Sequence, residues 1–388
     1  MEVVWWRPLL SLTLVLALII HEEWISAPSC KTVLNHESES EFGFTQENHP
    51  DDLKVMMVAN LLLTGSDSTF LHRLFSDYYM SKFFRKSYQS LAPDMLVVLG
   101  DVSAKGWELN KPKWESVLHQ FDQLLGPFLD LPLHVVLGDR DLGRCGELNR
   151  KSVNWVAGRF PGLDSAGCGA FEINNVSFVS LNAVALLCGN DDLRFSVEKV
   201  IERENVDLRT ERENFEEVVI DESDHGRESV GGLQWKEKDI SSGSGPVLLL
   251  HFPLCQIPFP NIVDDGRGSV GDGPYELLHN LPANATQYIF QALKPRIIFS
   301  AHSHEFSSYT HPDGTYEVSV PAMSWNARDD PGFIFAIFRS NKRAVSIIYC
   351  SLARESRVVM AYISILILLI LTVVLNLMKI PHFICSRQ

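Results

Sequence analysis

The chain lacks the features that mark several common classes of protein. It has no excess of basic residues, since 48 Asp and Glu outnumber 34 Lys and Arg and the net charge is −14. A nucleic-acid-binding protein needs a basic face, so this charge argues against that class. The seven cysteines form neither a Cys-x-x-Cys pair nor a Cys/His zinc pattern, which argues against a structural zinc site. No internal repeat is present, so one domain with an insertion is the simplest partition.

Cysteine usage leaves two interpretations open. Cys145, Cys168, Cys188 and Cys255 fall within the region where strands and helices are expected. In an oxidising compartment they can pair in disulfides, or they can be buried free thiols. The spacing does not determine the connectivity.

Long apolar segments lie near both ends of the chain. Residues 358–378 form an uninterrupted apolar run, which as a helix is about 30 Å long and can cross a bilayer. Residues 1–23 contain a second run that is either a signal anchor or a cleaved signal peptide. We find no small-x-small cleavage site, which favours the anchor. Arg7 precedes this run and two glutamates follow it, so we expect a cytosolic N-terminus, a luminal domain and a cytosolic tail at 379–388.

Two tripeptides agree with a luminal domain. Asn175-Val-Ser and Asn284-Ala-Thr are acceptor sequences for N-glycosylation. Such tripeptides also occur by chance, so each one alone marks only a candidate site.

Strands and helices are expected to alternate across residues 51–352, which we predict to be the catalytic domain. Amphipathic segments at 67–91 and 111–130 separate the first three apolar runs, and this order predicts parallel strands with helices packed outside them. Residues 24–50 are polar and without periodicity, so we expect a linker there.

An acidic insertion is expected at residues 191–245. Between residues 191 and 228, fourteen Asp or Glu outnumber six Lys or Arg by eight. This composition predicts a solvated or disordered segment. The alternative is a lid or a partner-binding arm over the active-site cleft.

Five predicted strands end in residues that can bind a metal. The runs are LKVMMVAN, MLVVLGD, LHVVLGDRD, VLLLHFP and RIIFSAHSH, and their terminal candidates are Asn60, Asp101, Asp139, His251, His302 and His304. Side chains at the carboxyl ends of strands converge on the crevice where open α/β sheets bind ligands. Mixed imidazole and carboxylate ligands suit Mn, Zn or Fe. The sequence therefore predicts a divalent-metal centre in a catalytic-type cleft.

The order of these residues resembles the calcineurin-like metallophosphoesterases. That family places D-x-H, GD, GNH(D/E), a lone His and GHxH at successive strand ends. Here the corresponding segments after the first are Gly100-Asp101, Gly138-Asp139-Arg140-Asp141, His251 and Ala301-His302-Ser303-His304. The resemblance covers nearly all of residues 53–349. It implies an α/β fold, the four-layer αββα sandwich of two mixed sheets, here with transmembrane helices at both ends.

The chain looks most similar to the membrane branch of that family, which removes ethanolamine phosphate from GPI anchors in the early secretory pathway. The likeness lies in the two terminal membrane segments and in the blocks SLNAVALL and SVPAMSWNARDDPGF. By resemblance, Trp325, Asn326 and Arg328 in the second block line the substrate cleft.

The family holds two divalent ions, and the resemblance assigns the ligands unequally. The second-metal site would comprise Asp101, Asp139, His251 and His302, with Asp101 bridging both ions. For the first-metal site Asp101 and His304 remain, whereas Asn60 and Leu62 replace the family's Asp and His. An amide is a weaker ligand than a carboxylate, and leucine cannot coordinate a metal. One or two ions are therefore possible.

A further departure affects catalysis. Arg140 stands where the family has the His that helps the leaving group. Arginine stays protonated near neutral pH, so it cannot shuttle a proton, but it can clamp phosphate oxygens.

Three functions follow from these observations. The first is a membrane-anchored phosphodiesterase with its catalytic domain in the lumen of the endoplasmic reticulum or Golgi, acting on the ethanolamine phosphate of GPI-anchored proteins. The second is a weak or inactive homologue that binds GPI-linked cargo, an alternative that Asn60, Leu62 and Arg140 keep open. The third is a phosphoesterase with another substrate, such as a nucleotide or a phosphoprotein.

Overall fold

Two mixed sheets of six strands each form the centre of the protein. The computed structural model describes residues 6–35, 52–67, 69–143, 145–188, 191–222, 245–256, 279–339 and 345–378. The first sheet has the order β1-β12-β11-β2-β3-β4, with β1 (Ser29–Asn35), β2 (Leu53–Val58), β3 (Met95–Leu99), β4 (Leu133–Val136), β11 (Gly332–Phe338) and β12 (Val345–Ser351). The second has the order β5-β6-β7-β8-β10-β9, with β5 (Gly169–Ile173), β6 (Val176–Ser180), β7 (Val247–Leu249), β8 (Ile297–Ser300), β9 (Ser307–Thr310) and β10 (Tyr316–Ser319).

The central strands of both sheets are parallel, as the alternation of strands and helices predicts. Strands β2, β3 and β4 pair in parallel in the first sheet, and β6, β7, β8 and β10 do so in the second. Antiparallel strands complete the β1 edge of the first sheet and both edges of the second. The second sheet includes the hairpin β5–β6, whose turn residues Asn174 and Asn175 have φ of 49° and 60°. The carboxyl ends of the parallel strands therefore meet at one edge of each sheet.

The side chains of strand β2 pack alternately against the second sheet and against the outer helices. Val55 and Met57 belong to a buried cluster that includes Val247 and Ile297 of the second sheet. Met56 and Val58 point the opposite way and join a cluster with side chains of the helices. All four are fully buried, and burying each contributes about 1.5–3 kcal/mol. The two sheets thus pack face to face, and each turns its other face to helices.

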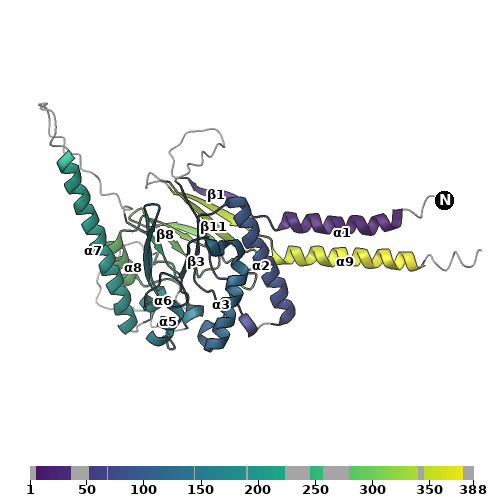
Figure 1. Cartoon of the computed structure of the whole chain (residues 1–388), viewed down its shortest axis with the longest axis horizontal. Helices are drawn as coiled ribbons and strands as arrows, with labels where there is room; N and C mark the ends of the chain where they lie inside the picture. The colour runs from purple at the N-terminus through teal and green to yellow at the C-terminus, as the bar shows by residue number, and fades with distance from the viewer. Residues whose placement is uncertain are drawn as a thin grey trace, which may run out of the picture.

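Helices cover the outer faces of the sheets (Figure 1). On the side of the first sheet lie α2 (Phe70–Leu91), α3 (Lys111–Leu125) and α5 (Arg150–Ala157), and on the side of the second lie α7 (Asp191–Glu222) and α8 (Ala283–Leu293). The short helices α4 (Asp139–Leu142) and α6 (Ala183–Leu187) and the 3-10 turns η1 (Gly65–Asp67), η2 (Gly106–Glu108) and η3 (Gly126–Asp130) lie in the connections. Helix α3 begins where Asn110 accepts a hydrogen bond from the Lys113 amide, and it buries Trp114, Val117 and Phe121 at helical spacing.

The acidic insertion begins as part of the folded domain, so the prediction of a solvated or disordered segment was wrong for its first turns. Residues 191–222 form α7, which contacts α6 and α8. Leu193, Val197, Val200 and Ile201 are buried, because their spacing places them on one face of the helix. Residues 223–244 of the insertion lie outside the described residues.

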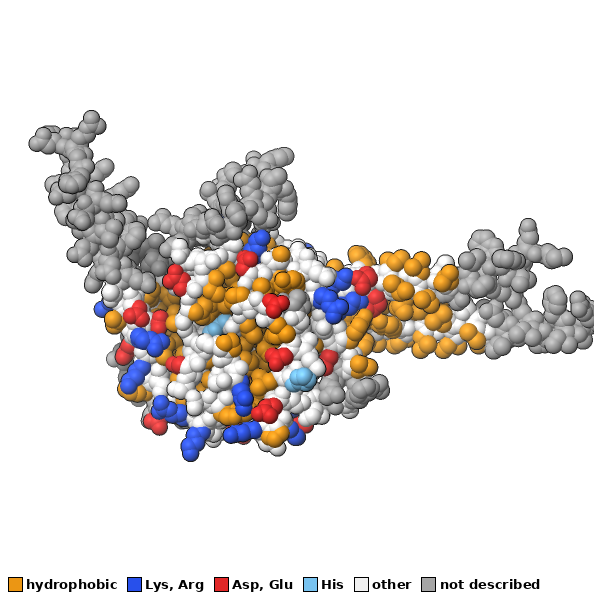
Figure 2. All heavy atoms as spheres, in the orientation of Figure 1, with side chains coloured by type: hydrophobic (Ala, Val, Ile, Leu, Met, Phe, Trp, Pro, Cys, Tyr) orange, Lys and Arg blue, Asp and Glu red, His pale blue; other side chains and the backbone are white. Residues whose placement is uncertain are grey.

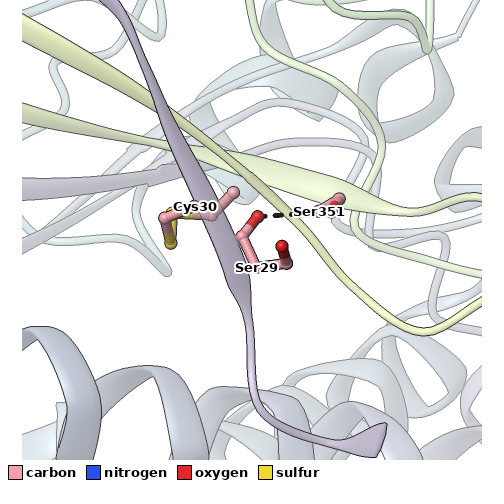
Figure 3. The surroundings of a disulfide bond; sticks show 4 residues. Ser29, Cys30 and Ser351 are labelled. Carbon is pink, nitrogen blue, oxygen red and sulfur yellow. Dashed lines mark hydrogen bonds between the residues drawn. A yellow bond between two sulfur atoms is a disulfide. The ribbon is translucent and has the colours of Figure 1, made fainter.

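The predicted polar linker at 24–50 was also wrong in part. Residues 29–35 form β1, an edge strand that pairs antiparallel with β12. Cys30 forms a disulfide with Cys350, and beside it the Ser351 hydroxyl donates a hydrogen bond to the Ser29 carbonyl at 3.2 Å (Figure 3). A strand held mainly by its ladder and a crosslink has no hydrophobic periodicity, which is why the pattern missed it. A second disulfide joins Cys145 to Cys188, whereas Cys168 and Cys255 are free.

Helices α1 (Trp6–Ile25) and α9 (Glu355–Met378) contact each other and project together from the domain (Figure 1). Apolar side chains cover much of their surface (Figure 2), among them the exposed Leu12 and Leu366. Within the described part of the chain, one helix, over Glu355–Val374, is long and apolar enough to cross a membrane. Where the pair leaves the domain, Glu22 of α1 accepts hydrogen bonds from Tyr79, Lys82 and Tyr362, which holds α1 against α2 and α9.

We predict that removing the Cys30–Cys350 crosslink destabilises the domain. The double variant Cys30→Ser, Cys350→Ser should lose about 2–4 kcal/mol of unfolding free energy, because the disulfide limits the separation of the first and last strands in the unfolded chain. The midpoint of urea unfolding of the detergent-solubilised protein measures the change. Cys255→Ser, at a free and half-buried position, is the control and should shift the free energy by less than about 0.5 kcal/mol. Equal midpoints for all three proteins would show that the β1–β12 ladder alone holds β1.

Candidate metal centre

Four predicted ligands from both sheets meet at the carboxyl ends of β3, β4, β7 and β8. The His251 Nε2 lies 3.1 Å from an Asp139 carboxylate oxygen and 3.5 Å from one of Asp101. The His302 Nδ1 lies 3.3 Å from the same Asp139 oxygen. The structure therefore brings together the residues that the sequence assigned to the second-metal site, and their role as ligands stays a prediction.

The spacing of these atoms fits a single small cation. Ligands at about 2.0–2.2 Å from a tetrahedral ion lie about 3.3–3.6 Å from one another. Three contacts, those of His251 with Asp101 and Asp139 and that of His302 with Asp139, span 3.1–3.5 Å. The ligand atoms of Asp139, His251 and His302 all lie within 4.8 Å of one another. Imidazole and carboxylate ligands suit Zn, Mn or Fe, so these three residues fit an ion of the kind that the family implies, and Asp101 borders them through His251.

His251 is held in the orientation that a ligand needs. It is fully buried, and its Nδ1 donates a hydrogen bond of 2.8 Å to the Leu99 carbonyl of β3. Because Nδ1 points to Leu99, Nε2 faces the two aspartates and donates a hydrogen bond to Asp139 at 3.1 Å. Loss of the Nε2 proton would free its lone pair for a metal. This contact requires glycine at position 100, because a Cβ there would lie 2.2 Å from the His251 ring. A Cβ on Gly138 would likewise lie 2.2 Å from the Asp101 carboxylate, so both Gly-Asp pairs serve close packing.

Unusual backbone conformations gather at the centre. Asn60, Leu62, Asp101, His302 and His304 all have φ between 52° and 61°, in the left-handed region that non-glycine residues seldom adopt. Each such residue costs about 1–3 kcal/mol and persists where the surrounding structure enforces it. Clusters of this kind mark functional sites, and this one includes every strand end that the sequence singled out except those of β4 and β7.

Electrostatic coupling within the centre sets its protonation. Burial raises the pKa of Asp101 to about 8, although His251 partly opposes the shift. Burial also works against ionisation of Asp139, but hydrogen bonds with His251 and His302 lower its pKa below its usual range. Burial disfavours the charged form of His251, yet Asp101 and Asp139 raise its pKa to about 9. Protons therefore compete with a cation for this site.

Asp141 organises the loops around the ligands. Its carboxylate accepts hydrogen bonds from the backbone N–H of Ser103 at 2.8 Å and of Gly138 at 3.0 Å. Burial raises its pKa to about 6. Asp141 thus caps the turn after β4.

The first-metal side is built differently. Leu62 is buried, with an apolar side chain that offers no ligand. Both polar atoms of the Asn60 side chain, one Asp101 oxygen and the His304 Nδ1 are buried without a hydrogen-bond partner among the described residues. The Arg140 Nε lies 3.5 Å from that Asp101 oxygen, so a cation already stands beside the carboxylate expected to bridge. The residues on this side do not fit a second ion.

The other predicted site residues border the centre. The Arg140 backbone N–H donates to Asp101 at 3.0 Å, while its side chain is 40% exposed. The Asn326 amide donates to the Leu62 carbonyl at 3.3 Å. Arg328 forms ion pairs with Asp330 and with Glu305, the residue after His304. Arg328 therefore braces the His302–His304 loop, and its contact with substrate stays a prediction.

His279 is a residue at the centre that the sequence did not identify. Its ring lies 5.8 Å from the ring of His302, and Phe252 packs against His302 from 4.1 Å. His279 follows no apolar run, so strand-end reasoning assigned it no role. Its exposed imidazole lies at the rim of the centre.

Both predicted glycosylation sites lie on the surface. Asn175 is exposed in the β5–β6 turn, and Asn284 is exposed in the first turn of α8. Exposure is a necessary condition for modification, and modification itself stays a prediction.

Comparisons with known proteins show the family of the chain. The family model of the calcineurin-like phosphoesterases matches residues 71–306, more than half of the chain. The protein therefore belongs to the calcineurin-like phosphoesterases, and it is a metal-dependent phosphoester hydrolase by family.

Individual relatives are more distant. Metallophosphoesterase 1 of Rattus norvegicus is 27% identical over 333 residues, which cover 85% of this chain and 79% of that protein. The Metallophosphoesterase 1 homolog of Drosophila melanogaster is 24% identical over 338 residues, covering 85% and 83%. A solved dimetal phosphatase from Danio rerio is 12% identical with a TM-score of 0.42, covering 73% of this chain and 92% of that one, a likeness too low to bear on the chemistry of the site.

We predict that metal affinity rises with pH. Asp101 and His251, with pKa values of about 8 and 9, both hold protons at pH 6, and a cation must displace these protons to bind. The affinity for Mn²⁺ should therefore increase between pH 6 and pH 8, by about tenfold per pH unit for each displaced proton. Calorimetric titration at pH 6, 7 and 8 measures it. Asp101→Asn should make the dependence shallower, because it removes one titrating group and the charge that raises the pKa of His251. Equal affinity at pH 6 and pH 8 would contradict the protonation scheme.

Proposed function

We propose that the protein is a membrane-anchored, metal-dependent phosphodiesterase that removes ethanolamine phosphate from GPI anchors in the lumen of the early secretory pathway. The observation that carries the proposal is the convergence of Asp101, Asp139, His251 and His302 at contact distances of 3.1–3.5 Å. The family indicates hydrolysis of a phosphoester, and the position of the centre near the base of α9 supports a lipid-linked substrate.

The residues of the centre divide the work of hydrolysis. A divalent ion bound here supplies positive charge to phosphoryl oxygens and lowers the pKa of its bound water. Asp139 and His302 face the ion, and His251 is aligned by its hydrogen bond to Leu99. The half-exposed guanidinium of Arg140 can bind phosphoryl oxygens but cannot release a proton to the leaving group.

A loop connects the centre to the base of α9, which supports a membrane-borne substrate. Residues 324–330 contact the centre through the hydrogen bond from Asn326 to Leu62. In the same loop, the Trp325 indole donates to the Ala353 carbonyl at 2.9 Å, and Asp329 accepts hydrogen bonds from Ser356 at 2.7 and 2.8 Å. The proposed site therefore lies close to the point where α9 would enter the bilayer, within reach of a lipid-linked phosphodiester.

Further observations support the proposed topology. Two disulfides occur among the described residues, as in proteins that fold in oxidising compartments. Helices α1 and α9 run side by side with apolar surfaces exposed, as expected of two anchors at 1–23 and 358–378. Exposed Asn175 and Asn284 would then face the lumen.

A second candidate function is a homologue that binds GPI-linked cargo without hydrolysing it. Leu62 and Asn60 on the first-metal side favour it, since the family's ligands are absent there. The two candidates differ in turnover and are separated by one assay.

The test compares a GPI glycan bearing ethanolamine phosphate with a nucleotide and a phosphopeptide, using the full chain in detergent with Mn²⁺. We expect metal-dependent release of ethanolamine phosphate and slower or no release from the other two substrates. His251→Ala should reduce the rate more than about 100-fold, because changes even in the outer shell of a metal cost 10–100-fold. His119→Ala, at an exposed position of α3, is the control and should leave the rate unchanged. Binding of the glycan without turnover would favour the cargo-binding homologue, and equal rates in His251→Ala and wild type would exclude the centre.

We also predict that the domain carries N-glycans. In cells, treatment with an endoglycosidase should increase its electrophoretic mobility, because Asn175 and Asn284 are exposed. The double variant Asn175→Gln, Asn284→Gln should migrate like the treated protein and no longer respond. Wild type that does not respond to the enzyme would contradict the luminal placement.

A further inference from the structure

The two halves of the centre differ in a way that goes beyond the proposed function. We propose that this protein works with one divalent ion, and that Arg140, Asn60 and His304 form a phosphoryl-binding half in place of a second ion. This inference rests on the metal centre of the proposed function, and its substrate class is a phosphodiester with a single negative charge.

Leu62 cannot bind a metal through its side chain, but its backbone has the same left-handed conformation as the predicted ligands around it. Leu62 has φ of 52°, and its N–H donates to the Asp101 carbonyl at 3.0 Å. The strained loop is thus retained, but the side chain that it presents is buried and apolar. A second ion at this position would lack one ligand and would lie beside an apolar side chain.

Arg140 places a fixed positive charge beside the Asp101 oxygen that would bind a second ion. The Arg140 backbone N–H binds one Asp101 oxygen at 3.0 Å, and its Nε lies 3.5 Å from the other, which has no hydrogen-bond partner. The main chain of Arg140 therefore donates a hydrogen bond to one oxygen of the carboxylate, and its side chain faces the other oxygen as an ion pair. A dication at this oxygen would have to displace the guanidinium and would be repelled by it.

Asn60 and His304 supply buried polar atoms without a hydrogen-bond partner among the described residues, among them the donor nitrogen of the Asn60 amide. The Asn60 side chain is fully buried, and neither its oxygen nor its nitrogen has a hydrogen-bond partner among the described residues. The buried Nδ1 of His304 is also without one. Buried polar groups in native proteins are nearly always paired, so these atoms point to a bound partner. Phosphoryl oxygens accept hydrogen bonds from an amide, an imidazole and a guanidinium alike, and arginine in particular binds them in a planar, bidentate manner.

The charge of such a centre selects among phosphate esters. Asp101, Asp139 and the buried Asp141 are opposed by one dication and by Arg140, which leaves no net charge. A phosphodiester adds one negative charge to this centre, whereas a phosphomonoester adds close to two near neutral pH. The one-ion centre therefore favours a diester.

The first test is metal stoichiometry, which does not depend on activity. The full chain, equilibrated with excess Mn²⁺ and freed of unbound metal, should hold one Mn per chain by elemental analysis. Its electron paramagnetic resonance spectrum should show the six-line pattern of an isolated ion. Two ions per chain, or the spectrum of a coupled pair, would overturn this inference and leave the proposed hydrolase standing. No bound ion would overturn the proposed function as well.

The second test measures inorganic phosphate binding to the Mn²⁺-loaded protein by calorimetry. Arg140→Met should weaken it by about 10–100-fold, the value of a hydrogen bond to a charged group, with one ion still bound, and Arg140→Lys should recover part of the loss. Arg194→Met, at a side chain of matching exposure (42%) on α7, is the control and should bind as wild type does. Unchanged affinity in Arg140→Met would overturn the role of Arg140.

A gain-of-site variant completes the design. Asn60→Asp, Leu62→His and Arg140→His together should raise the stoichiometry to two ions, and retention of the first ion reports that the variant is folded. A folded variant that still holds one ion would overturn the assignment of these three residues.

Discussion

The hydrogen bond from His251 to the Leu99 carbonyl is the contact on which the centre depends. It runs from the end of β7 in one sheet to the end of β3 in the other. The two sheets pack through apolar side chains, which do not specify atomic positions by themselves, whereas this buried bond aligns His251 with Asp101 and Asp139. Gly100 makes the approach possible, since any side chain there would collide with the imidazole. The geometry of the centre therefore depends on the face-to-face packing of the two sheets.

The strain in the surrounding loops follows from the same arrangement. Backbone hydrogen bonds join Asn60 to Gly100 and Leu62 to Asp101. Together with the loop after β8, these loops hold five non-glycine residues at positive φ. Their cost is offset by the large apolar core on both faces of each sheet. The conformation at Leu62 persists although its side chain has no polar function, which indicates that the loop is held by its neighbours rather than by a ligand.

The loop of residues 324–330 connects the centre to the start of α9. It contacts Leu62 through Asn326, braces the His302–His304 loop through Arg328 and holds the start of α9 through Asp329. The loop therefore connects the first-metal side, the His302–His304 loop and the start of α9. At the same end, Glu22 joins α1 to α2 and α9, so both apolar helices leave the domain from one supported base.

The sequence by itself determined the core strands, their parallel order and the candidate ligands, because apolar runs ending in Asp, Asn or His are local patterns. It also showed that Asn60, Leu62 and Arg140 depart from the family. It failed where stability comes from partners distant in the chain. The strand at residues 29–35 depends on β12 and Cys350, the first turns of α7 depend on α6 and α8, and the pairing of Cys145 with Cys188 depends on the packing of both loops. Only the tertiary structure placed Arg140 beside Asp101, His279 beside His302 and the loop of residues 324–330 beside α9. Contacts between distant segments depend on how the layers pack and not on any single segment.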